Sequence, residues 1–378
     1  MNKLKVLTIL GTRPEIIKLS RVISEMDKFF DHKIVHTGQN YDYELNEIMF
    51  CQLDLRKPDI FLDSAVDSPA GTIGNVIIKT DQIIMKEKPD AILILGDTNS
   101  CMSAIAAKRR KVPIFHMEAG NRCFDQRVPE EVLRKIVDHT ADINLPYSEI
   151  AKNYLINEGF QPDRIIKIGS PMKEVLDFYS NKINSSTILK QIGLETNKYF
   201  IVSAHREENV DSKEKLVKIV DIIKSISDIY KLPVIVSTHP RTRKNLEKIN
   251  IDLTSNKLIS FMKPFGFLDY VKLQINSFCV ISDSGTISEE SSILNFPAIN
   301  LRETHERPEA SEEASVIMVG LNKDRLLSSL SILKNQKRGA IRDLNLVSDY
   351  NIDNVSKKIV RIISSYTDYI KRDVWKEF

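Results

Sequence analysis

Short apolar runs alternate with longer stretches of helical periodicity along almost the whole chain. Apolar runs of this length are typical of buried parallel strands, and apolar positions three and four apart are typical of helices covering a sheet. In the first half the expected strands are 6–10, 33–36, 91–95, 113–117, 143–145 and 165–168. The expected helices are 16–26, 43–50, 73–86, 103–110, 130–139 and 149–157. This order predicts a doubly wound parallel sheet.

The pattern breaks once, at the polar residues 180–198, and then restarts. The expected strands of the second half are 200–203, 234–237, 258–261, 278–282 and 297–301, and the expected helices are 213–229, 242–248, 268–276 and 287–294. We therefore predict an α/β protein with two doubly wound Rossmann-like domains, residues 1–180 and 181–378, that face a central cleft. A final helix, at about 355–370, is expected to pack back on the first domain.

Composition narrows the class of protein. The 378 residues are enough for two domains, and 42% hydrophobic with 28% charged residues is ordinary for a globular chain. A net charge of +3 favours neither nucleic acid nor a membrane surface as partner. No apolar run in the chain is long enough for a bilayer, and we expect no signal peptide from its first residues. The four scattered cysteines lack metal-type spacing, so we expect them to pack as small apolar residues in the reducing cytoplasm.

The stretch Ile281–Glu290 reads as the end of a strand, a tight turn and the start of a helix. Unpaired N–H groups and the positive end of the helix dipole make such a place an anion site. Ser284 adds a hydroxyl, Gly285 lets a phosphate approach the backbone, and Glu289 or Glu290 could bind the hydroxyls of a ribose. The alternative is a plain turn in which acidic residues merely favour the helix start.

Gly11–Glu15 follows the first expected strand, and Lys18 lies one turn into the helix. Arg13 and Lys18 are expected to serve as cations for a diphosphate, since both point toward the end of the strand. The alternative is a helix start with ordinary surface bases. The glycine spacing does not match a dinucleotide fingerprint, so NAD is not expected.

Three carboxylates are expected at the carboxyl ends of neighbouring strands. Asp97 and Glu118 each follow an apolar strand, and Glu130 opens the next helix. Carboxylates that share a site raise one another's proton affinity, which suits one of them to general acid/base catalysis. Asp97 as a helix cap and Glu130 as a residue that favours a helix start are the simpler alternatives. A metal is not expected, because no two histidines have ligand spacing.

Three polar segments of the second half also follow strands. They contain His205 and Arg206, then His239, and then the charged run 302–309 with Arg302, Glu306 and Arg307. Each could be an ordinary surface loop. Their shared position at strand ends favours a binding site instead.

Taken in order, six segments resemble those of the non-hydrolysing UDP-N-acetylglucosamine 2-epimerase family. They are Gly11-Thr12-Arg13-Pro14-Glu15, Gly96-Asp97-Thr98, His116-Met117-Glu118-Ala119-Gly120, Ala204-His205-Arg206-Glu207, Asp283-Ser284-Gly285 and Glu306-Arg307-Pro308-Glu309. The resemblance spans about residues 4–370. It implies the two-domain glycosyltransferase-B fold and inversion of C2 in a UDP-2-acetamido sugar, without NAD or metal.

The resemblance also implies roles for individual residues. Asp97, Glu118 and Glu130 match the catalytic carboxylates, and His205 matches a histidine needed for activity. Arg13 and Lys18 match bases near the diphosphate and sugar. Tyr270 matches an aromatic residue that packs on uracil, Ser284, Gly285 and Thr286 match the phosphate loop, and Glu290 matches the ribose carboxylate. A homodimer is expected from the family alone.

Two departures from the family pattern refine the expected substrate. The segment Thr37–Asp42 lacks the Gln-His-Arg of the commoner members, which puts allosteric regulation by a UDP-sugar in doubt. The loop Gly120–Pro129 is short and lacks the usual Tyr and Trp. This resembles the subgroup that converts UDP-2-acetamido-2,6-dideoxy-L-talose to UDP-N-acetyl-L-fucosamine for capsule or O-antigen. Conversion of UDP-N-acetylglucosamine to UDP-N-acetylmannosamine, a glycosyltransferase of the same fold and a silent UDP-sugar-binding protein are the alternatives.

Overall fold

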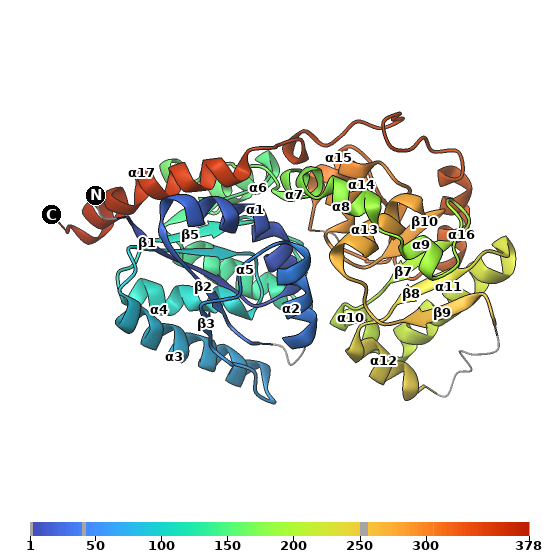
Figure 1. The fold of residues 1–378 in the computed structure, drawn as a ribbon, viewed down its shortest axis with the longest axis horizontal. Helices are drawn as coiled ribbons and strands as arrows, with labels where there is room; N and C mark the ends of the chain where they lie inside the picture. The colour runs from blue at the N-terminus through green and yellow to red at the C-terminus, as the bar shows by residue number, and fades with distance from the viewer. Residues whose placement is uncertain (1–2, 40–42, 250–255, 305, 378) are drawn as a thin grey trace. The chain divides into compact units, whose positions relative to one another are not determined.

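The structure is a computed structural model that describes residues 3–39, 43–249, 256–304 and 306–377. The chain forms two compact units. Unit 1 comprises residues Met1–Phe178 and Asp349–Phe378, and unit 2 comprises Tyr179–Ser348. Each unit is an α/β layer structure with its own six-stranded parallel sheet (Figure 1).

The sheet of unit 1 has the strand order β3-β2-β1-β4-β5-β6, with every neighbouring pair parallel. Its strands are β1 (Lys5–Leu10), β2 (Asp31–His36), β3 (Ile60–Phe61), β4 (Ala91–Leu95), β5 (Ile114–Met117) and β6 (Ile143–Leu145). The helices are α1 (Arg13–Phe29), α2 (Tyr43–Gln52), α3 (Pro69–Glu87), α4 (Ser103–Arg109), α5 (Pro129–Thr140), α6 (Glu149–Asn157), α7 (Met172–Phe178) and α17 (Val355–Trp375). The order reverses direction between β1 and β4, which is the topological switch point where such sheets bind ligands.

Helices cover both faces of this sheet, because the strands are apolar on both sides. Leu7 and Ile9 of β1 share one buried cluster with residues of α3, α4 and α5. Thr8 faces the other way, toward Met26 of α1. The last helix, α17, packs along α1, so the end of the chain belongs to unit 1 (Figure 1).

Unit 2 repeats the topology, with the strand order β12-β11-β10-β7-β8-β9. Its strands are β7 (Phe200–Ser203), β8 (Val234–Ser237), β9 (Ile259–Met262), β10 (Cys279–Ser282), β11 (Ala298–Asn300) and β12 (Ile317–Met318). The helices are α8 (Ser180–Ser185), α9 (Ile188–Gln191), α10 (Glu207–Val210), α11 (Lys213–Tyr230), α12 (Pro240–Glu247), α13 (Phe267–Asn276), α14 (Ile287–Leu294), α15 (Pro308–Glu312) and α16 (Lys323–Leu333). Here the order reverses between β7 and β10.

Two apolar clusters lie on the two faces of the second sheet. Phe200 and Val202 pack with α11 and α16, whereas Ile201 packs with α9, α13 and α14. The alternation along β7 therefore sends successive side chains into opposite layers. Both units are Rossmann-like, as the alternation of strands and helices predicts.

The elements differ from those expected in a few places. The segment Ile165–Ile168 is not a strand: Ile165 makes a single bridge to Asn144, and this expectation was wrong. The two-residue strands β3 and β12 were not expected, because two residues are too few to show a period, and helix α16 was not expected either. Cys101, Cys123 and Cys279 are buried as expected, but Cys51 is exposed. Within the described ranges, none of the helices combines the length and apolar character needed to cross a bilayer.

Candidate functional site

The candidate residues of unit 1 lie where strands β1, β4 and β5 end. Arg13 is the first residue of α1 and is partly exposed. Asp97 and Glu118 follow β4 and β5, which are neighbours in the sheet. Since all these strands are parallel, their carboxyl ends meet at one edge of the sheet.

A buried carboxylate, Glu15, ties two of these strand ends together. It accepts hydrogen bonds from the backbone N–H groups of Gly11 and Thr12 after β1. It also accepts hydrogen bonds from the hydroxyls of Thr98 and Ser100 after β4. Thr12 and Glu15 form a capping box, a signal that the sequence carries but that the sequence analysis did not use. Burial raises the pKa of Glu15 to about 7, although these hydrogen bonds favour the ionised form.

Glu15→Gln is expected to change how stability depends on pH. The folded pKa of about 7 lies above the ordinary value of 4.5, so folding favours the protonated carboxyl. This contribution is complete below pH 4.5 and is lost as pH rises through 7, a loss of about 3 kcal/mol. Glutamine resembles the protonated form, so the variant keeps its stability over this range. Urea unfolding of both proteins between pH 5 and 8 measures the difference, and parallel curves would contradict the assignment.

Glu118 pairs with Lys18 and has an unusual backbone conformation. The Lys18 Nζ to Glu118 Oε2 distance is 2.6 Å, and the two side chains are only 3% and 10% exposed. Glu118 has φ +65°, in the left-handed region that costs a residue with a side chain about 1–3 kcal/mol and is concentrated at functional sites. Lys18 also lies 5.4 Å from the ring centre of Tyr147. Its cation therefore faces a carboxylate here, which the expectation of a diphosphate partner did not include.

Helix α5 presents a line of charged residues to the same strand ends. Glu130, Arg134 and Asp138 are four residues apart, so they share one side of the helix. Arg134 pairs with Asp97 at 2.6 Å, and Asp138 accepts a hydrogen bond from Gly120. Glu130 is partly exposed in the first turn. Glu130 was predicted from the sequence, whereas Arg134 and Asp138 were not.

Glu131 anchors the loop between β5 and α5. It is fully buried and accepts hydrogen bonds from the backbone N–H groups of Cys123 and Phe124, at 3.1 and 3.3 Å. Arg134 Nη1 lies 3.1 Å from its carboxylate. The Phe124 side chain remains 71% exposed. Glu131 therefore stands in the first turn of α5 and also fixes this loop.

In unit 2 a buried carboxylate joins the two strands at the switch point. Asp283, directly after β10, accepts hydrogen bonds from the backbone N–H groups of His205 and Arg206 after β7. It also accepts one from the Asn209 side chain. The Nδ1 atom of His205 lies 3.4 Å from Asp283 Oδ1, and the imidazole is 40% exposed. Asp283 thus holds the backbone of the segment that presents His205, a role we did not predict for it.

Several arginines lie near the turn before α14, and each is paired with a carboxylate. A Cβ atom at Gly285 would lie 3.3 Å from Glu306 Oε2 and 3.7 Å from Arg206 Nη2. Glu306 also pairs with Arg302, at 3.2 Å, and Arg307 lies 3.7 Å from Glu289. Among the described residues, the buried Nε of Arg302 has no hydrogen-bond partner. The site therefore brings several guanidinium groups to a turn whose hydroxyls, those of Ser284 and Thr286, lie 3.0 Å apart.

The remaining candidates of unit 2 lie on α12, α13 and α14. Gln274 donates a hydrogen bond of 2.6 Å to Glu290, which is 7% exposed. Burial, followed by the charge of Glu290, raises the pKa of Tyr270, whose side chain also hydrogen-bonds to Ser203. These two candidates therefore lie near each other. His239 caps α12, its Nδ1 accepting a hydrogen bond from the backbone of Arg241.

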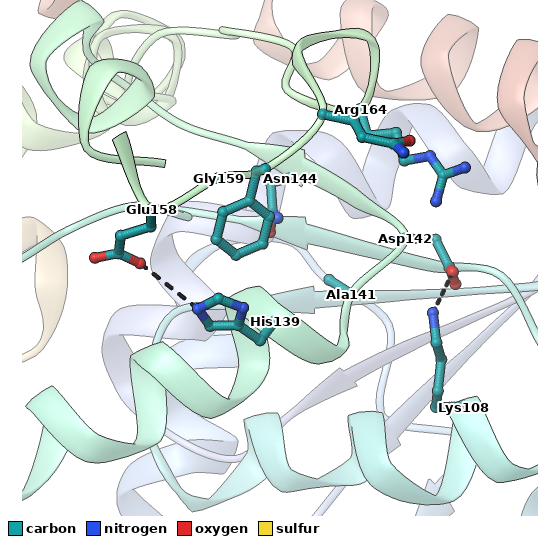
Figure 2. A pocket seen from close by; sticks show the side chains of 10 residues that line it. Lys108, His139, Ala141, Asp142, Asn144, Glu158, Gly159 and Arg164 are labelled. Carbon is teal, nitrogen blue, oxygen red and sulfur yellow. Dashed lines mark hydrogen bonds and ion pairs between the residues drawn. The ribbon is translucent and has the colours of Figure 1, made fainter. Parts of the chain in front are cut away.

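A separate polar hollow of about 280 Å³ lies at the other end of the first sheet (Figure 2). Asp142, which precedes β6 and binds the N–H of Ile114 at the start of β5, lines it together with Lys108 and Glu158. Lys108 pairs with Asp142, and Glu158 lies 3.7 Å from His139. None of the expected site residues lines this hollow. Across the described part of the chain, no group of His, Cys, Asp and Glu side chains is arranged to hold a metal ion.

Comparison with known proteins gives one consistent family. A family model described as UDP-N-acetylglucosamine 2-epimerase matches residues 24–364. The UDP-N-acetylglucosamine 2-epimerase of Methanocaldococcus jannaschii is 36% identical over 369 residues, which is 96% of this chain and 99% of that protein. Its crystal structure in complex with UDP-GlcNAc and UDP has a TM-score of 0.90 and matches 96% of this chain and all of that one.

Two further proteins extend the comparison. The structure of the Rickettsia bellii protein named UDP-N-acetylglucosamine 2-epimerase is 51% identical, covers both chains fully and has a TM-score of 0.93. The UDP-2,3-diacetamido-2,3-dideoxy-D-glucuronate 2-epimerase of Pseudomonas aeruginosa is 34% identical over 332 residues, 86% of this chain and 91% of that protein. Its sequence identity to this chain, 34%, is close to the 36% of the M. jannaschii protein, although the two proteins are named for different sugars. Sequence identity at this level therefore does not distinguish between sugars.

Proposed function

The chain belongs to the UDP-N-acetylglucosamine 2-epimerase family, and on that premise we propose that it inverts C2 of a UDP-2-acetamido sugar. Members of this family are carbohydrate isomerases. The observation that carries the proposal is the Lys18–Glu118 pair at the end of β5. It places a nearly buried carboxylate beside a cation, in a backbone conformation that the surrounding structure must impose.

Glu118 is proposed to take the C2 proton. A neighbouring ammonium favours the ionised form of a carboxylate, which is the form that a general base requires. As the C2–H bond breaks, the bond between C1 and the β-phosphate oxygen breaks as well. The electron pair forms a C1–C2 double bond, and the products are a 2-acetamidoglycal and UDP. Asp97, Glu130 and His205 are the candidates for returning a proton to the opposite face, after which UDP adds back to C1.

Unit 2 is proposed to hold UDP before and after this step. The first N–H groups of α14, which have no acceptor within the helix, and the Ser284 and Thr286 hydroxyls suit phosphate oxygens. Arg206, Arg302 and Arg307 would stabilise the charge that develops on the departing diphosphate. Their carboxylate partners keep these cations in place when no ligand is bound. Glu290 is proposed to bind the ribose hydroxyls, and Tyr270 to pack on uracil.

For the sugar we propose UDP-2-acetamido-2,6-dideoxy-L-talose, with UDP-N-acetyl-L-fucosamine as product, for capsule or O-antigen. The support is the short loop after Glu118, in which Phe124 is exposed and the backbone N–H groups of Cys123 and Phe124 are bound by Glu131. An exposed apolar side chain in this loop suits a sugar whose C6 carries no hydroxyl. The names of the relatives favour UDP-N-acetylglucosamine instead, and it is the second candidate substrate.

Proton NMR in D₂O separates these substrates. The purified protein is incubated with each UDP-sugar in separate tubes and without any acceptor. Deuterium at C2 and a fuco-configured product from the L-talose sugar alone would support the proposed substrate. Conversion of UDP-N-acetylglucosamine alone would replace it with the second candidate. If neither sugar exchanged its C2 proton, epimerisation of both would be excluded and acceptor-dependent transfer would be tested next.

Glu290→Ala is expected to weaken UDP binding and to change turnover little. A charge-assisted hydrogen bond to a ribose hydroxyl contributes about 1.5–3 kcal/mol, which corresponds to a rise of about 10- to 100-fold in the Kd for UDP. Calorimetric titration with UDP measures this change, and the rate at saturating substrate measures turnover. Glu214→Ala is the control, since Glu214 lies on the exposed side of α11 and pairs with Lys218. An unchanged Kd in Glu290→Ala would remove Glu290 from the UDP site.

A further inference from the structure

We infer that Asp138 is a positioning residue for the proposed epimerisation: from helix α5 it holds a side chain before Glu118 and the backbone after it. This inference rests on the proposed function, since it concerns the residue that takes the C2 proton. Asp138 lies in the last turns of α5 and is fully buried. It belongs to none of the sequence segments that point to the family.

A single carboxylate holds the segment His116–Arg122 at three points. On one side of Glu118, the Nδ1 atom of His116 lies 2.9 Å from Asp138 Oδ1. On the other side, the backbone N–H of Gly120 donates to Asp138 Oδ2 at 3.1 Å, and Arg122 Nη1 donates to the same oxygen at 2.7 Å. Glu118 lies in the middle of the span that these contacts fix.

The backbone of the segment His116–Arg122 is also constrained by its conformation and by its close packing. Gly120 has φ +80°, and a Cβ atom there would lie 2.4 Å from the carbonyl oxygen of Ala151. The backbone of residue 120 therefore needs glycine and fits closely against α6. Glu118 itself has φ +65°, a conformation that persists only where neighbouring contacts determine it. The contacts of Asp138 supply that determination.

His116 extends the same support to the neighbouring strand end. Its Nε2 atom lies 2.9 Å from the carbonyl oxygen of Gly96, which directly precedes Asp97. Both ring nitrogens of His116 thus face acceptors, and the imidazole joins the ends of β4 and β5. Asp138 thereby influences two of the proposed carboxylates through the backbone without being placed against the substrate.

The charge of Asp138 is maintained by its neighbours. Burial by itself would raise its pKa, but His116 and the Arg122 guanidinium together hold the pKa of Asp138 below its ordinary range. Arg122 is itself fixed by a bidentate pair with Glu158, at 2.7 and 2.6 Å. An ionised carboxylate can accept from Gly120 and Arg122 while it faces the His116 ring, whereas an amide cannot serve all three, because part of it must donate.

The chain offers a matched control for the substitution Asp138→Asn. Asp142 is also buried, and it also combines a backbone hydrogen bond with a cation: it accepts from Ile114 N at 2.9 Å and pairs with Lys108. These contacts hold β5 at its start, whereas those of Asp138 hold the segment after its end. Asp142→Asn therefore removes a similar buried charge that contacts the start of the same strand, β5, away from Glu118.

We expect Asp138→Asn to lower kcat by about 100-fold, the size of effect that a small misplacement of a catalytic group produces. The KM and the Kd for UDP should stay within about threefold, since unit 2 is proposed to hold UDP. The isotope effect on kcat with C2-deuterated substrate should rise, because proton removal becomes the slow step. Asp142→Asn should lose a similar amount of thermal stability and keep kcat within about threefold of wild type.

His116→Asn tests the same inference if Asp138→Asn does not fold. Its amide can replace Nδ1 toward Asp138 but cannot reach Gly96, and we expect kcat to fall by about tenfold with an unchanged KM. An unchanged kcat in a folded Asp138→Asn protein would overturn the inference. So would equal losses of kcat in Asp138→Asn and Asp142→Asn, or, where only His116→Asn folds, an unchanged kcat there. No C2 exchange in the wild type with any UDP-sugar would instead overturn the proposed function, and this inference with it.

Discussion

Glu118→Gln is expected to lower turnover by about 10³-fold or more while UDP still binds. A general base contributes about 10²–10⁴-fold to a rate, and glutamine can neither accept nor return a proton at this position. The amide keeps the length of the side chain and one oxygen toward Lys18, so the geometry of the strand end should survive. Solvent deuterium incorporation at C2 measures turnover, and calorimetric titration with UDP measures binding.

Glu87→Gln provides the control for this experiment. Glu87 also pairs with a lysine in unit 1, Lys33 of β2, and lies at the end of α3. If loss of any Lys–Glu pair in unit 1 disturbed the protein, both variants would lose turnover together. We expect only Glu118→Gln to do so. Wild-type turnover in Glu118→Gln would show that another group takes the C2 proton.

The fold could be predicted largely from the sequence because its strands are apolar on both faces. The run Ala91–Leu95 is too apolar to be anything but a buried strand, and its observed bounds agree with the prediction. The same reasoning failed at Ile165–Ile168, an apolar run that makes only one bridge to β6. An apolar run shows that residues are buried, and only its neighbours decide whether it pairs as a strand.

The candidate residues of the site could be predicted because the topology sends strand ends to one edge. What the sequence could not show is which charged groups pair with which. Lys18 and Glu118 are one hundred positions apart, and their contact depends on the order β1-β4-β5 in the sheet. Arg134 could not be predicted for a different reason. An arginine on a helix with acidic neighbours is typical of a solvent-exposed face. In the structure, however, Arg134 is buried and binds Asp97.

In both units a buried carboxylate binds backbone N–H groups at the ends of the central strands. In unit 1 Glu15 joins the loops after β1 and β4, and in unit 2 Asp283 joins the loops after β7 and β10. In each case a fully buried carboxylate accepts backbone N–H groups at the switch point of the sheet. Parallel strands leave such N–H groups without partners at their ends, and a carboxylate can accept several at once. Both residues stand in segments that the sequence marks as candidate sites, but their role as links between two strand ends could be recognised only once the strand order was known.

Lys18→Met is expected to lower turnover by about 10²–10³-fold and to make it depend more steeply on pH. Without its ammonium, the nearly buried Glu118 holds a proton more tightly, so less of it is ionised at neutral pH. A general base works in its ionised form, so the rate of the variant should rise with pH over a range in which the wild type is flat. Rates of C2 deuteration between pH 6 and 9 measure this change. A flat profile at wild-type rate would mean that Lys18 does not act on Glu118.

The double variant Lys18→Met/Glu118→Gln separates the contribution of this pair to folding from its contribution to chemistry. Lys18→Met alone leaves a nearly buried carboxylate without a cation, which costs up to about 3 kcal/mol of stability. Removing both charges relieves that cost, so we expect the double variant to be more stable than Lys18→Met by about 2 kcal/mol. Turnover should remain absent, because no base has been restored. Recovery of stability together with turnover would show that the pair serves only folding, and the C2 base would then have to be sought among Asp97, Glu130 and His205.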